Sequence, residues 1–154
     1  MSAVFPQITD AKVQAKDFMN QSDAQLALYH LQNLPYVIVS DESAGGASDS
    51  TTNDYIFVAP CKGEILKADF WKTVVNTGTG NTPVVKLVNG SNVVGETAAI
   101  ALSGAIGDVH ALTLDSAKVS FAAGDKLVFR IVTPASTVSA ALKGKLQFIW
   151  KPVA

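Results

Sequence analysis

Apolar and polar residues alternate along the last part of the chain, between residues 139 and 151. Leu142, Leu146, Phe148 and Trp150 fall on one side of this pattern, and lysine and glutamine residues fall on the other. A period of two is typical of a β-strand that buries one face, because successive side chains of a strand point in opposite directions. We therefore predict a strand here, with the four named residues in the core.

Short segments of the same kind follow one another from Tyr55 to Val153, separated by turns that contain Gly, Asn and Pro. One of these turns, Asn89-Gly90, is a strong signal for a hairpin. Many short strands with such turns are typical of an antiparallel sandwich. We predict an all-β jelly-roll sandwich of about eight to ten strands, formed by residues 54–60, 64–76, 83–88, 92–94, 97–102, 109–115, 119–121, 126–133 and 139–151.

The segment 64–76 carries apolar residues on both of its faces. We assign one face to the core, namely Leu66, Ala68, Phe70 and Val74. A second apolar face on the same strand indicates a surface that another subunit covers. The candidate subunit-interface residues are therefore Ile65, Trp71 and Val75.

The first part of the chain has a different pattern. Ser22 and Gln25 have the spacing of a capping box, apolar residues follow, and Pro35 would end a helix. These signals predict a short helix over residues 23–33. A brief apolar strand is expected at residues 36–39.

Residues 40–53 contain no large apolar side chain. Because such a stretch gains little from burial, we expect a mobile loop or linker. The predicted organisation is an N-terminal arm, residues 1–54, with a short helix and this loop, followed by a sandwich domain at residues 55–154.

The composition narrows the class of protein. Charged residues make up 16% of the chain and the mean hydropathy is +0.25, against a typical charged fraction of about 25%. Either apolar surface is hidden against other subunits, or the chain is a compact monomer covered by Ser, Thr and Asn. No stretch is long and apolar enough for a membrane span, and the N-terminus has no signal-peptide pattern.

Charge is divided unevenly along the chain. Residues 1–54 hold seven of the thirteen acids and two of the twelve bases. The arm could lie on a basic neighbouring surface, or both regions could simply face water. The lysines are scattered and Arg130 is the only arginine, which argues against nucleic-acid binding.

Candidate catalytic groups are few. Cys61 is the only cysteine. It could act as a nucleophile with His110 or His30 as the base, or it could be an inert thiol. His110 continues an alternating apolar pattern, which favours packing over metal binding. We expect no enzymatic activity, no cofactor, no metal and no small-molecule substrate.

Other features have structural explanations that compete with functional ones. The glycine-rich segment 77–82 lacks the ending of a phosphate loop and fits a hairpin loop better. Asp108, Asp115 and Asp125 flank turns, where aspartate bonds to local amides; a calcium site is the alternative. Trp71 and Trp150 could stack on sugars, but packing is the simpler role for aromatic residues inside strands.

Three stretches, residues 57–65, 85–94 and 121–129, resemble the β-domains of tailed-bacteriophage virion proteins. They contain an Ala-Pro-x-x-Gly-x-Ile opening, a Val-Asn-Gly hairpin and an Ala-Gly-Asp strand entry, and are most similar to small capsid decoration (cement) proteins. Tumour-necrosis-factor-like trimers share such motifs. In Ala-Gly-Asp, we expect a positive φ at the Gly and a turn bonded by the Asp.

The resemblance implies a homotrimer on the capsid surface that binds the major capsid protein and stabilises the head, with synthesis in the host cytoplasm. The family supplies no transferable contact residues. The apolar residues of the arm are candidate capsid contacts: Phe5, Ile8, Val13, Phe18, Leu26, Leu28 and Leu31. The alternative is a receptor- or glycan-binding module of a head fibre or tail fibre.

Overall fold

A computed structural model of the protein describes residues 34–45, 50–74, 78–80, 82–101, 103–134, 136–138 and 142–153. Residues Pro35–Ala154 form one compact unit. The predicted helix at residues 23–33 and all seven candidate arm residues lie outside the described part of the chain. The described residues contain strands and no helix, which confirms the all-β prediction.

The strands are β1 (Tyr36–Val39), β2 (Ser43–Ala44), β3 (Ser50–Val58), β4 (Gly63–Lys72), β5 (Gly78–Gly80), β6 (Val84–Asn89), β7 (Asn92–Glu96), β8 (Val109–Ala111), β9 (Thr113–Leu114), β10 (Ser120–Phe121), β11 (Lys126–Thr133), β12 (Ser136–Val138) and β13 (Lys143–Pro152). They form two larger sheets and a two-stranded ribbon of β5 and β12. All strand pairs are antiparallel.

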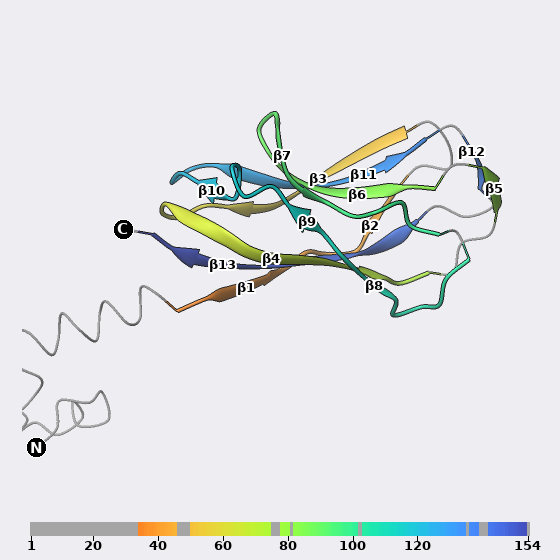
Figure 1. The fold of residues 1–154 in the computed structure, drawn as a ribbon, viewed down its shortest axis with the longest axis horizontal. Coiled ribbons are helices and arrows are strands. Elements are labelled where there is room, and N and C mark those ends of the chain that lie inside the picture. The colour runs from red at the N-terminus through yellow and green to blue at the C-terminus, as the bar shows by residue number, and fades with distance from the viewer. Residues whose placement is uncertain are drawn as a thin grey trace, which may run out of the picture. The chain divides into compact units, whose positions relative to one another are not determined.

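The two larger sheets face each other as layers of a sandwich (Figure 1). Sheet A has the order β1-β13-β4-β10, with β2 also paired to β13 and β8 to β4. Sheet B has the order β3-β11-β6-β7-β9. Strands β1 and β3 are therefore edge strands of their sheets.

The core lies between the two sheets. Phe70 of sheet A packs against Phe129 of sheet B, with ring centroids 5.9 Å apart, and Phe57 of sheet B meets Phe148 of sheet A at 5.6 Å. Edge-to-face and tilted ring contacts of this kind add to the burial of apolar area. The inward positions predicted on the last strand are confirmed as buried: Leu142, Leu146, Phe148 and Trp150. On β11, the alternating residues Leu127, Phe129 and Ile131 are buried as well.

The alternation predicted for β4 is wrong at its start. The pairing of β4 with β13 shifts between Ile149 and Trp150, so Leu66 is an extra residue opposite β13. Such a bulge reverses which side chains point inward. Ile65 is consequently buried, at 2% exposure, while Leu66 is 44% exposed. Phe70 beyond the bulge is buried as predicted.

The stretch predicted as a loop at residues 40–53 contains strands in its described part. β2 pairs with β13, and residues from Ser50 onward belong to β3, which pairs with β11 along its length. Backbone pairing and side-chain bonds hold these polar residues in place; for example, the Ser43 hydroxyl donates to Asp54 Oδ2. The sheets therefore include residues from the predicted arm.

Two other predicted strands differ from the structure. Residues 97–101 form no strand, although the Thr97 and Ile100 amides bond to the Val85 and Pro83 carbonyls beside β6. The segment predicted at 109–115 divides at Leu112. Its first part, β8, joins sheet A and its second part, β9, joins sheet B.

The predicted turns are confirmed. Gly90 links β6 and β7 with φ 58°, and Gly124 precedes β11 with φ 85°. Asp125 Oδ2 accepts hydrogen bonds from the Ala122 amide at 2.9 Å and from Asn89 Nδ2 at 2.7 Å. This carboxylate therefore ties together the turns at one end of sheet B.

Candidate interaction surfaces

The outer face of sheet A carries several exposed apolar side chains among polar ones. Three of its rows run across strands: Val37, Ile149 and Lys67; Val39, Gln147, Asp69 and Ala111; Lys145, Trp71 and Val109. Exposed fractions are 55% for Val37, 54% for Val39, 45% for Trp71 and 58% for Val109. We call Val37, Val39, Trp71 and Val109 together the apolar face. Several large apolar residues exposed on one face of a sheet are typical of a surface that another molecule covers.

Charge at the apolar face is largely compensated. Lys67 Nζ lies 2.8 Å from Asp69 Oδ2, and the Asp69 side chain is only 9% exposed. Lys145 is exposed in the same row as Trp71. The ion pair therefore lies within the face, among the apolar residues.

The three candidate interface residues have different positions. Trp71 lies on the apolar face, as the sequence suggested. Ile65 lies in the core because of the bulge at Leu66, so its side chain does not contribute to the outer surface. Val75 lies outside the described residues. The sequence signal missed Val37, Val39 and Val109, because the strands that carry them are too short to display a period.

The outer face of sheet B carries a polar row. One row crosses four strands and consists of Asn53, Arg130, Lys86 and Glu96. Arg130 Nε donates a hydrogen bond of 2.6 Å to Asn53 Oδ1, and Lys86 Nζ lies 2.8 Å from Glu96 Oε2. Arg130 and Lys86 are direct neighbours across the strands. Two like charges placed opposite each other destabilise a sheet unless an anion compensates them.

A groove of about 520 Å³ follows β11 on this face. It is lined by Asn53, Asn89, Gly90, Gly124, Asp125, Lys126, Val128 and Arg130. The hydrogen bonds from Asn89 and from the Ala122 amide hold the pKa of the Asp125 carboxyl below its usual value. The groove thus contains two cations, Lys126 and Arg130, beside a carboxylate that is engaged by the turn.

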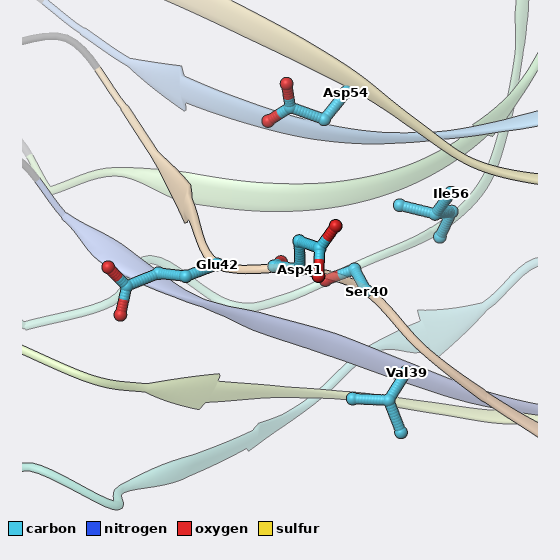
Figure 2. A pocket seen from close by; sticks show the side chains of 6 residues that line it. All are labelled: Val39, Ser40, Asp41, Glu42, Asp54 and Ile56. Carbon is cyan, nitrogen blue, oxygen red and sulfur yellow. Dashed lines mark hydrogen bonds between the residues drawn. The ribbon is translucent and has the colours of Figure 1, made fainter.

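A second pocket, of about 310 Å³, opens between β3 and the chain that follows β1. Figure 2 shows Asp54 and Ile56 on β3, opposite the segment from Val39 to Glu42. Three carboxylates line it, from Asp41, Glu42 and Asp54. Within the described residues, no group of three or more metal-ligating side chains has the arrangement of a metal site.

The candidate catalytic groups do not converge. Cys61 is half-buried before β4 and packs against the core, while His110 pairs with Phe70 near the other end of β4. His110 lies beside the Phe70 ring, 6.3 Å between centroids, and its Nε2 is buried with no hydrogen-bond partner. From Gly63 to Phe70, β4 extends over seven residue steps, or about 23 Å at 3.3 Å per residue. His30 lies outside the described residues.

Lys72 is an unusual buried cation at the end of β4. It is 1% exposed, and its Nζ lies 3.4 Å from the carbonyls of Ala101 and Gly104. Burial lowers its pKa, and the nearby Asp108 carboxylate acts in the opposite direction. Lys72 therefore joins β4 to the segment that leads into β8.

The aspartates at turns bond to their own turns. Asp115 accepts a hydrogen bond from the Ala117 amide and pairs with Lys118 at 2.8 Å. These contacts lower the pKa of the Asp115 carboxyl, with the Lys118 hydrogen bond as the largest cause.

No helix in the described part of the chain is long and apolar enough to cross a membrane.

No protein-family model matches the chain, and no curated protein is significantly similar to it in sequence. Among solved structures, a chain of the cyanophage Pam1 capsid asymmetric unit is similar, with a TM-score of 0.59 and 10% identity over 79% of this chain and 87% of that chain. FLHE has a TM-score of 0.44 at 14% identity, covering 77% of this chain and 98% of its own. A chain of infectious bursal disease virus, Gx strain, has a TM-score of 0.38 at 10% identity, covering 78% of this chain and 34% of that one.

At these identities, the comparisons concern the fold alone. The Pam1 likeness extends over most of both chains. The all-β sandwich of this protein is thus a fold that also occurs in a viral capsid.

Proposed function

We propose that the protein is a structural virion protein, a homotrimeric decoration (cement) subunit that binds the outer surface of the major capsid protein lattice and stabilises the head. The proposal includes jelly-roll connectivity and a location on the capsid surface. It assigns the protein no enzymatic activity. In this proposal the protein acts by binding to copies of itself and to the capsid lattice.

The apolar face carries this proposal. Val37, Val39, Trp71 and Val109 are each about half exposed, on one side of a sheet whose other side forms the core. Covering such residues is favourable by roughly 25 cal/mol per Å² of apolar area removed from water. We assign this face to contacts between copies of the chain. The fold likeness to a chain of the Pam1 capsid asymmetric unit supports the virion setting.

The mechanism is stabilisation by mass action. A subunit that binds the assembled lattice, and not its separated components, shifts the equilibrium toward the assembled form. Three linked copies that bind three lattice sites add avidity, because the second and third contacts form within one complex. Residues 1–33 precede the edge strand β1 and contain the seven apolar candidate capsid contacts. We assign the capsid contact to this arm.

Cosedimentation with heads assembled without the protein tests this function. The full chain should sediment with the heads, and mass photometry of the free protein should give the mass of three chains. A monomer that does not sediment with heads would overturn the proposal. The heads must be those of the phage that encodes the chain, because decoration depends on one lattice.

Deleting residues 1–33 tests the arm separately. The compact unit begins at Pro35, so both sheets remain complete in this variant. We expect loss of head binding with an unchanged β-sheet circular dichroism spectrum. A matched control keeps the length of the arm and replaces its seven apolar candidates by serine, which should have the same effect. Head binding by both variants would disprove the role of the arm and leave the trimer intact.

A further inference from the structure

In the polar row on sheet B, one of the two positive charges has no acidic partner among the described residues. Arg130 and Lys86 are direct cross-strand neighbours, and only Lys86 has an acidic partner, Glu96. Arg130 bonds to the neutral amide of Asn53. No carboxylate of the described residues pairs with Arg130. Facing like charges destabilise a sheet, so an added anion at Arg130 would relieve a repulsion that the fold contains.

The Arg130 side chain is oriented for such an anion. Its Nε is engaged by Asn53 Oδ1 at 2.6 Å, which fixes the plane of the guanidinium group. The two terminal nitrogens of the group remain in the fork geometry that matches a carboxylate. Arg130 is half-buried and lines the groove of about 520 Å³. A half-buried cation interacts more strongly with an anion than a fully solvated one does.

The side chains that β11 contributes to the groove are regularly spaced. Lys126, Val128 and Arg130 lie at alternate positions of β11 and all line the groove. The two cations are four residues apart, or about 13 Å along an extended strand. An extended peptide has the same repeat, so acidic residues at positions j and j+4 can meet both cations while an apolar residue at j+2 contacts Val128.

We infer that this groove binds an extended acidic segment of a partner protein, with the pattern acidic-x-apolar-x-acidic. The Arg130 guanidinium holds one carboxylate in a bidentate contact, Lys126 attracts the other, and Val128 contacts the apolar residue between them. We assign the segment to the capsid lattice, as a second contact beside that of the arm, and this part of the inference rests on the proposed function. The groove and its ligand pattern do not.

A peptide titration tests the groove without capsids. The probe is an end-blocked peptide containing Glu-Thr-Val-Thr-Glu, titrated into the full chain by calorimetry and by NMR of the Arg130 side chain. We expect saturable binding that weakens as salt is added, since charge pairs at the surface are screened. Replacing both glutamates by glutamine, or moving them two residues apart, should weaken binding about 10-fold or more. Equal binding of these control peptides would overturn the inference.

Variants identify the residues. Arg130→Gln should weaken binding of the probe about 10- to 100-fold, the range expected for a charge-assisted bidentate contact. Lys145→Gln, on the other sheet, is the matched control and should bind as the wild type does. Unchanged affinity of Arg130→Gln would disprove the site, whatever the outcome of the head-binding experiments.

Other anions separate a carboxylate site from a general anion site. Inorganic sulfate and a heparin oligosaccharide should shift the Arg130 signals only at concentrations well above those needed for the peptide. If the heparin oligosaccharide binds more tightly than the peptide, the groove is a sulfated-glycan site and the inference is wrong.

Discussion

The two outer faces of the sandwich differ in chemistry although they belong to one small core. The face of sheet A presents Val37, Val39, Trp71 and Val109, and its main ion pair, Lys67 with Asp69, is internal to the face. The face of sheet B presents a row of amide and charged groups and a groove with two cations. Association through the first should depend on water exclusion, and through the second on charge.

Because of this difference, we expect the two faces to make different kinds of contact. Apolar burial is non-directional and is little affected by moderate salt, which suits a permanent contact between copies. A charged groove gives orientation and specificity but loses affinity as salt rises. Salt dependence therefore separates contacts made by the two faces.

Phe70→Ala should have the largest effect, because it removes the core that both faces share. Phe70 is fully buried and touches Phe129 of the opposite sheet. Loss of a buried aromatic ring costs about 3–5 kcal/mol. Urea unfolding should show this decrease in the free energy of unfolding. A decrease below about 1 kcal/mol would mean that the sheets do not depend on this contact.

Trp71→Glu should disrupt the apolar face without unfolding the chain. A buried interface tryptophan contributes about 2 kcal/mol or more, so the association constant between copies should fall about 30-fold or more. Sedimentation velocity over a concentration series measures this change. Lys145→Glu, in the same row, is the control and should associate nearly as the wild type does. Similar losses in both variants would point to charge and contradict an apolar contact.

Glu96→Gln tests whether charge compensation in the polar row stabilises sheet B. It removes the partner of Lys86 and leaves Lys86 facing Arg130 uncompensated. We expect a loss of roughly 0.5 kcal/mol in the free energy of unfolding, larger at low salt. Adding Lys86→Gln should recover most of the loss. If the double variant is as unstable as the single one, repulsion between Arg130 and Lys86 is not the cause.

The smallest effect is expected from pH at Asp125. Its hydrogen bonds to Asn89 and to the Ala122 amide place its pKa below the ordinary value of 3.8. The unfolded chain therefore binds a proton first as pH falls, so this stabilisation is complete above 3.8 and disappears as pH falls through the folded-state pKa.

Asp125→Ala isolates this contribution. The difference in unfolding free energy between wild type and Asp125→Ala should be constant near neutral pH and should shrink once the pH falls below 3.8. Urea unfolding at several pH values measures it. A difference that does not change with pH would mean that the carboxylate charge plays no part in the turn.

The sequence predicted the features of this fold that are local or periodic. The alternation of Leu146, Phe148 and Trp150 identified their burial, and Asn89-Gly90 identified a hairpin. The Ala-Gly-Asp turn has the expected positive φ at Gly124 and the expected hydrogen bonds to Asp125. Each of these signals depends on neighbouring residues only.

Features that depend on distant partners were not predictable. The bulge at Leu66 arises from pairing with β13, some eighty residues later, so the sequence placed Ile65 on the wrong side. Polar residues 50–53 are ordered by β11 and not by their own burial. Val37, Trp71 and Val109 come from three separate strands, and only the sheet order reveals that they share a face.

Fluorescence quenching of Trp71 tests the central claim most directly. Trp71 is 45% exposed in one copy and Trp150 is 4% exposed. The difference between wild type and Trp71→Phe therefore isolates the signal of Trp71. Acrylamide quenching of Trp71 should be strong at low protein concentration and weak once copies associate, at low and moderate salt alike. If Trp71 stays equally accessible in the associated protein, the outer face of sheet A is not the contact between copies.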